Sequence, residues 1–174
     1  MIFSNQYTDY SSKTKKELYQ TLILFFILSS KNIVFIGKIL LSISLKLRVP
    51  ILGIIKKTIF KHFCGGEDII ESQSTINHLG RYNIKTILDY SIEGKSNNEI
   101  FEKTHLEIIR NLEEAQQNLL IPFCVFKITG IARFSLLKKI NQKTILSKEE
   151  IEEFKILKTR LNIIVQKAKE IQIP

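Results

Sequence analysis

Two short apolar runs of strand length, each followed by a longer stretch with helical periodicity, most constrain the fold. The first run is 85–90 and the second is 122–128. The second run is apolar almost throughout, which is typical of a strand buried on both faces. A strand, helix, strand, helix order predicts βα units with a parallel sheet, so the expected fold class is α/β.

The helical stretches between and after these runs have recognisable periods and ends. Residues 99–118 carry apolar side chains at Ile100, Leu106, Ile109 and Leu112, and a short helix is expected over 133–140. Ser147 followed three residues later by Glu150 forms the pattern of a capping box, which predicts a long helix running to about 171.

Two parallel strands do not make a complete domain, because both faces and both edges of such a sheet stay open. Residues 173–174 resemble the beginning of a third strand. We therefore expect an N-terminal helical arm over 1–80, and the first part of a larger α/β domain over 81–174, cut off before its third strand.

The first third of the chain is both the most basic and the most apolar part. Residues 1–66 hold ten Lys and Arg against two Asp and Glu, whereas 67–174 hold sixteen against fifteen. The longest uncharged run, 18–30, has thirteen residues, fewer than the roughly 20 that a membrane span needs. A basic amphipathic helix over 31–48 either lies on an anionic bilayer or a partner domain, or packs on its own protein. The last reading is the more common one.

A tight backbone element is expected over 63–66, where Gly65 and Gly66 can adopt positive φ angles. Glu67 and Asp68 follow in the first turn of a helix that Gly80 ends, because carboxylates favour the positive end of the helix dipole.

Several kinds of chemistry are not indicated. The chain has no GxGxxG, GxxxxGK[ST], HExxH or GxSxG pattern, and its three histidines are scattered. Cys64 and Cys124 lie sixty residues apart, which gives neither a disulfide framework nor a zinc motif, so both are expected to be buried small apolar groups. No metal is expected. Nucleic acid is not an expected partner either, since only five of the 26 basic residues are Arg and no recognition motif is present.

Polar side chains lie at the carboxyl ends of both predicted strands. Asp89 and Glu93 follow the first, and Lys127, Thr129 and Gly130 follow the second. Catalytic groups of parallel α/β barrels lie at this end of the sheet. A lysine within an apolar strand needs a carboxylate partner, and Asp89 is the natural one. Two readings stay open: a stabilising ion pair, or a lysine that binds a carboxylate or phosphate of a substrate.

Five segments resemble, in order and spacing, the N-terminal half of bacterial single-domain proline dehydrogenase. They are 47–50, 53–58, 63–67, 87–94 and 122–130. The resemblance covers the chain from about residue 29 to its end.

This resemblance implies a distorted (βα)8 barrel that holds FAD, oxidises L-proline to Δ1-pyrroline-5-carboxylate and passes the electrons to a membrane quinone. Lys127 is similar to the family's lysine that pairs with the substrate carboxylate. Glu93 is similar to the glutamate that gates the site, and Asp89 would orient Lys127. The residues that contact FAD are not assigned.

The resemblance also implies that most flavin contacts lie in later strands, so a C-terminal half is an expected partner. We expect the chain alone neither to hold FAD tightly nor to oxidise proline. The expected location is cytoplasmic, with peripheral association at the inner face of the membrane left open. The alternative function is a basic amphipathic helical module that binds a membrane surface or a partner without catalysis.

Overall fold

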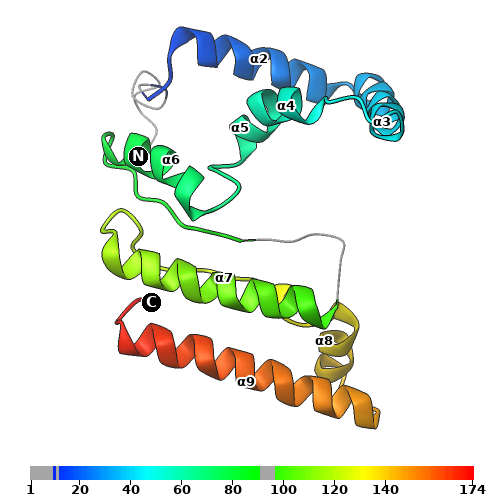
Figure 1. Cartoon of the computed structure of the whole chain (residues 1–174), viewed down its shortest axis with the longest axis vertical. Helices are drawn as coiled ribbons and strands as arrows, with labels where there is room; N and C mark the ends of the chain where they lie inside the picture. Colours follow the sequence, from blue (N-terminus) through cyan, green and yellow to red (C-terminus); the bar gives the residue numbers. More distant parts are fainter. Residues whose placement is uncertain (1–9, 11, 91–96) are drawn as a thin grey trace. The chain divides into compact units, whose positions relative to one another are not determined.

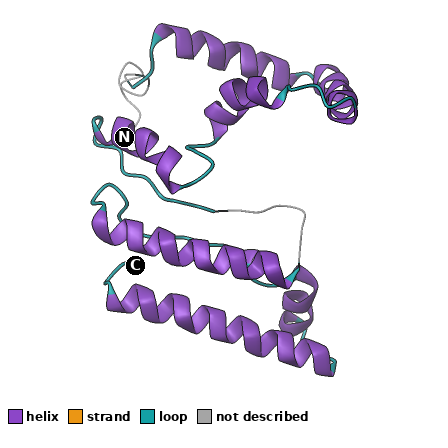
Figure 2. Cartoon of the chain, in the orientation of Figure 1, coloured by secondary structure: helices purple, strands orange, loops and turns teal. Residues whose placement is uncertain are grey.

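The computed structural model describes residue 10 and residues 12–90 and 97–174. The chain divides into two compact units, Met1–Tyr82 (unit 1) and Asn83–Pro174 (unit 2). Each unit is described by itself. Within the described residues both units consist of helices joined by loops, with no strand (Figure 2).

Unit 1 contains a series of helices with short connections (Figure 1). They are α2 (Lys15–Ser29), α3 (Lys31–Lys46), α4 (Leu52–Ile55), the π-helix η1 (Lys56–Phe60), α5 (Lys61–Phe63) and α6 (Ile69–Gly80). Thr14 and Glu17 form a capping box at the start of α2, and the Ser30 hydroxyl accepts from the Ile33 amide at the start of α3. The aromatic ring of Phe25 in α2 contacts those of His62 and Phe63 edge to face.

The loop before α6 is held by charge and by close backbone packing. Asp68 is the N-cap of α6, and its carboxylate accepts from the Glu71 amide at 2.8 Å. Lys56 Nζ lies 3.0 Å from Glu67 and 2.8 Å from Glu71. The hydrogen bond from Lys56 lowers the pKa of the Glu71 carboxyl below its ordinary value.

Replacing Gly66 with alanine is expected to destabilise this junction by about 1–3 kcal/mol, the usual cost of overpacking. A Cβ at Gly66 would lie 2.5 Å from the Ser72 amide nitrogen and 2.8 Å from the Glu71 carbonyl carbon. Gly66 is therefore needed for space. Neither Gly65 nor Gly66 adopts the left-handed conformation that a glycine allows. Hydrogen exchange of the α6 amides measures the effect.

The matched control is Gly65→Ala, whose Cβ would have its nearest neighbour at 3.9 Å. It should change the protection of α6 by less than about 0.5 kcal/mol. Equal loss of protection in both variants would contradict the steric explanation.

Unit 2 is built on two long parallel helices, α7 (Asn98–Gln117) and α9 (Lys148–Glu170), which lie side by side (Figure 1). The 3-10 turn η2 (Ile128–Gly130) and α8 (Phe134–Asn141) connect them. The predicted helices over 99–118, 133–140 and 148–171 are confirmed within two residues at each end, and so is the Ser147 capping box.

An apolar core lies between α7, α9 and the chain around η2. Its buried members are Ile108, Leu112, Ile131, Ala132, Leu157 and Ile164. Cys124, Phe126 and Ile173 are partly buried against them.

A buried arginine joins the same elements. Arg160 is only 5% exposed. It donates to Glu102 Oε2 at 3.0 Å, to Asn98 Oδ1 at 2.7 Å and to the Ile131 carbonyl at 3.3 Å. Burial raises the pKa of the Glu102 carboxyl, but hydrogen bonds from Arg160 and His105 outweigh it and lower that pKa.

The predicted α/β class, with two βα units of a barrel over 81–174, is wrong. Both predicted strands are loops, over 84–90 and 121–127. Among the described residues, one backbone hydrogen bond links the first loop to the residue just before the second. It runs from the Thr86 amide to the Leu120 carbonyl, at 2.8 Å. A β-ladder needs such bonds at regular intervals. Alternate side chains of the second run pack on the core, but among the described residues no strand pairs with its backbone. The Cys124 amide donates instead to the Pro174 carbonyl at 3.0 Å.

No single described helix is long and apolar enough to cross a membrane. Together, α2 and α3 pass the test of length and composition, but they are bent by 95° at the break between them.

Candidate functional site

The ion pair expected between Asp89 and Lys127 is present. Lys127 Nζ lies 3.4 Å from Asp89 Oδ2, and the Lys127 side chain is 60% exposed. Lys127 has an extended backbone and precedes the first turn of η2. An exposed ion pair of this kind contributes only about 0–1 kcal/mol to folding. Its ammonium group therefore remains available to a second anion from solvent.

Alternating side chains of the 121–127 loop explain why Lys127 faces outward. Cys124 and Phe126 pack on the core of unit 2, whereas Phe123, Val125 and Lys127 are exposed. Period-two alternation of this kind comes from an extended backbone and does not require a sheet. The core thus fixes the backbone on which Lys127 is carried.

Both cysteines were predicted to be buried; Cys124 is partly buried, and Cys64 is not. Burial, and secondarily the charge of Asp89, raise the pKa of the Cys124 thiol, which keeps it neutral. Cys64 is exposed, so its predicted burial is wrong. Its loop precedes α6, where no apolar layer covers it.

Two of the three predicted site residues can be compared with the structure. Asp89 and Lys127 come together, although the prediction placed them at the ends of neighbouring strands and the structure places them on loops. Glu93, the predicted gate, lies outside the described residues. The roles of all three toward a substrate stay predictions.

Gly130 lets η2 pack closely on α7. A Cβ at this position would lie 3.2 Å from Thr104 Cγ2. The Gly130 amide donates to the Lys127 carbonyl at 2.8 Å. The turn that follows Lys127 is therefore fixed against a helix, and this limits the movement of the Lys127 backbone.

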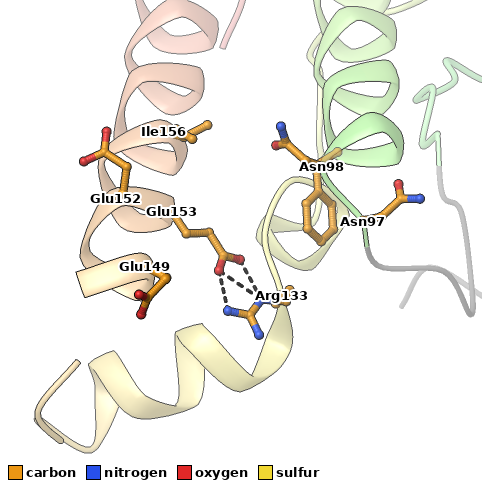
Figure 3. Close-up of a pocket in the computed structure, with 8 residues that line it drawn as sticks. Asn97, Asn98, Arg133, Glu149, Glu152, Glu153 and Ile156 are labelled. Carbon is orange, nitrogen blue, oxygen red and sulfur yellow. Dashed lines mark hydrogen bonds and ion pairs between the residues drawn. The ribbon is translucent and has the colours of Figure 1, made fainter. Parts of the chain in front are cut away.

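A second feature, which the sequence did not predict, is a cleft of about 440 Å³ in unit 2 (Figure 3). The starts of α7, α8 and α9 form it. Its lining residues are Asn97, Asn98, Phe101, Arg133, Glu149, Glu152, Glu153 and Ile156. The acidic residues after Ser147 are the only sequence signal for this cleft, and they indicate equally well the start of a helix.

Charge determines what this cleft can bind. Arg133 Nε donates to both carboxylate oxygens of Glu153 at 2.9 Å, and these hydrogen bonds raise the pKa of the arginine. Glu152 pairs with Lys155, which is not one of the lining residues. The lining itself holds three carboxylates, of Glu149, Glu152 and Glu153, against the single guanidinium group of Arg133, so it is acidic. An anionic diphosphate such as that of FAD would be repelled here, so this cleft does not fit a flavin cofactor. The described residues also contain no group of three or more metal-ligating side chains.

The fold and the site together define a helical protein with a solvent-exposed ion pair between Lys127 and Asp89. Two curated proteins are similar to the chain. Proline dehydrogenase 1, mitochondrial, of Dictyostelium discoideum is 36% identical over 138 residues, which cover 76% of this chain and 24% of that protein. The carbapenem antibiotics biosynthesis protein CarD of Pectobacterium carotovorum subsp. carotovorum is 28% identical over 100 residues, which cover 58% of this chain and 27% of that protein.

The chain is thus related to proline dehydrogenase, in agreement with the resemblance of its motifs. It spans about a quarter of the length of the curated relatives it matches. No model of a known family and no solved structure matches it.

Proposed function

We propose that this chain supplies the carboxylate-binding site of a protein that oxidises L-proline. One observation carries the proposal: the Asp89–Lys127 pair lies in the part of the chain that is related to proline dehydrogenase. A match that covers 76% of 174 residues has to include the central region, which contains both residues. In this proposal the ion pair between them orients Lys127 for a substrate.

The proposed roles follow from the charges of proline. Its α-carboxylate would bind the Lys127 ammonium group, while Asp89 positions that group from the other side. Fixing the carboxylate limits how the pyrrolidine ring can turn, and such orientation can supply several kcal/mol of catalysis. We assign Glu93 the role of a gate, as the resemblance implies.

An electron acceptor has to complete the reaction. Conversion of L-proline to Δ1-pyrroline-5-carboxylate removes two electrons and two protons. The resemblance implies FAD as the first acceptor and a quinone as the second. Because the acidic cleft does not suit FAD, we assign no step of the transfer to the described residues. Purified alone, the chain should lack the visible absorption of stoichiometric flavin.

Lys127→Met should weaken binding of L-proline to the purified chain by about ten-fold or more, because a hydrogen bond to a charged group contributes roughly 1.5–3 kcal/mol. Isothermal titration calorimetry measures the affinity, which is expected in the millimolar range for the original chain. Asp89→Asn keeps the ammonium group and should have a smaller effect.

Lys155→Met is the matched control, because Lys155 is equally exposed and also pairs with a glutamate, Glu152, at 3.0 Å. It should leave proline binding unchanged. Prolinamide, which lacks the carboxylate, should bind neither the original chain nor the Lys155→Met variant. Failure of the original chain to bind millimolar proline, or equal losses in both lysine variants, would overturn the proposal.

A further inference from the structure

We propose that the cleft at the starts of α7, α8 and α9 binds a small organic cation that carries an aromatic ring, of the arylalkylammonium class. This inference concerns unit 2 only and does not rest on proline oxidation. It assigns a ligand to a cavity that neither Asp89 nor Lys127 lines. The ring and the positive charge of the ligand follow from two different parts of the lining.

The first argument is the size of the cleft and its apolar part. Its volume of about 440 Å³ lies within the range of small-molecule sites, roughly 300–1,000 Å³. Phe101 of α7 and Ile156 of α9 both line it, and Phe101 is only 5% exposed. Figure 3 shows that the Ile156 side chain points from α9 toward α7. A ligand ring that covers these two side chains would remove apolar surface from water.

The second argument is charge. The lining holds three carboxylates against a single guanidinium group, that of Arg133. Arg133 donates to both carboxylate oxygens of Glu153, so this pair leaves the lining with the negative charges of Glu149 and Glu152. A hydrogen bond from the Ser147 hydroxyl lowers the pKa of the Glu149 carboxyl, which is therefore ionised at neutral pH. Such a lining favours a cation.

Neighbouring lysines do not remove this charge. Lys155 pairs with Glu152 from outside the lining, and both side chains are exposed, so this ion pair is weak. Lys139 pairs with Glu150, which does not line the cleft. In the part of the chain that the structure describes, no Lys or Arg forms an ion pair with Glu149.

The third argument is the spacing of the lining residues along α9. Residues 149, 152, 153 and 156 follow the order i, i+3, i+4, i+7, so they lie on one face of the helix. Ile156 comes one helical turn of about 5.4 Å after Glu152. The cation and the ring of one ligand can therefore contact the same face if a short alkyl linker separates them.

An anion fits this cleft less well, although helix N-termini attract anions. The starts of α7 and α9 are already capped, because the side-chain oxygens of Asn97 and Ser147 each accept an amide of the first turn. At the start of α8, Glu153 holds the guanidinium group of Arg133. An anion would have to displace Glu153 and would then lie near several carboxylates.

A nuclear magnetic resonance titration of the full 174-residue chain tests the proposal. The probes are phenethylamine, phenylacetate and methylamine at neutral pH. Phenethylamine should shift the amide signals of 97–101 and 149–156 saturably, with a Kd of about 1 mM or below. Phenylacetate has a similar aromatic body with the opposite charge, and methylamine has the charge without a ring. Each should bind at least about ten-fold more weakly than phenethylamine.

One pair of variants tests the charge of the lining. Glu149→Gln combined with Glu152→Gln should weaken phenethylamine binding about ten-fold. The matched control is Glu113→Gln combined with Glu170→Gln, which changes the net charge equally in the last turns of α7 and α9. Those positions lie more than a Debye length of about 10 Å from the cleft, so the affinity should change by less than about two-fold.

A second pair of variants tests the apolar part of the lining. Ile156→Gln should weaken phenethylamine binding about five-fold, because the ring loses an apolar contact. Ile163→Gln on the same helix should leave the affinity unchanged, although Ile163 is the more exposed of the two isoleucines. Circular dichroism of each variant verifies that its helix content is unchanged.

Three results would overturn the proposal. They are the lack of a saturable shift of the cleft amides up to about 20 mM phenethylamine, equal affinity for phenylacetate or methylamine, and equal losses in a variant and its control. The result is independent of the proposed function, because Lys127→Met should bind phenethylamine like the original chain even if proline does not bind.

Discussion

Arg160→Met is expected to lower the free energy of unfolding of unit 2 by about 3 kcal/mol, within the range measured when one partner of a buried charged pair is removed. The guanidinium group links Asn98 and Glu102 of α7 to the Ile131 carbonyl from its position in α9. Methionine fills much of the volume but leaves the Ile131 carbonyl and Asn98 without these donors. Glu102 is half exposed, so water limits the penalty on that side.

Hydrogen exchange of the α7 amides in increasing urea measures this change in unit 2 alone. Arg110→Met is the control, because Arg110 is exposed and pairs with Glu107 within the same helix. That variant should lose less than about 0.5 kcal/mol. If both variants lose the same stability, burial of Arg160 is not the cause.

Ile131→Ala should destabilise unit 2 by about 2–4 kcal/mol, the usual cost of removing a buried isoleucine side chain and leaving a cavity. Ile131 is fully buried and packs in the cluster that joins α7 to α9. It also follows the η2 turn directly, so the cavity would loosen the connection between Lys127 and the core.

Ile145→Ala provides the comparison, since Ile145 is 93% exposed. Its stability, measured by urea denaturation with circular dichroism, should lie within about 0.5 kcal/mol of the original chain. Similar losses at both positions would show that isoleucine content, and not the core of unit 2, determines stability.

Local signals in the sequence were sufficient to predict the helices of unit 2. Ser147 and Glu150 marked the start of α9 because a cap depends on residues three apart. Glu67 and Asp68 were expected in the first turn of the next helix, whereas Asp68 is the N-cap of α6, which begins at Ile69. The Asp89–Lys127 contact was predicted for a buried lysine at adjacent strand ends. The contact is present, but it joins two loops and Lys127 is 60% exposed.

The absence of a sheet from the described residues could not be derived in this way. Residues 121–127 have strand-like composition, but ladder hydrogen bonds need a second backbone at the right distance, and composition does not specify one. The cleft and the Arg160 network were missed for a similar reason. Each joins residues that lie far apart in the chain, such as Arg133 with Glu153 and Arg160 with Asn98.

By itself, the sequence determined the ends of the helices in unit 2 to within two residues and the acid-free basic segment over 18–66. The tertiary structure alone decided that the apolar run before Lys127 packs as a loop on α7 and α9, and that this loop brings Lys127 to Asp89. The physical reason is range: caps and helical periods act within a few residues, whereas strand pairing and burial depend on which distant segments meet.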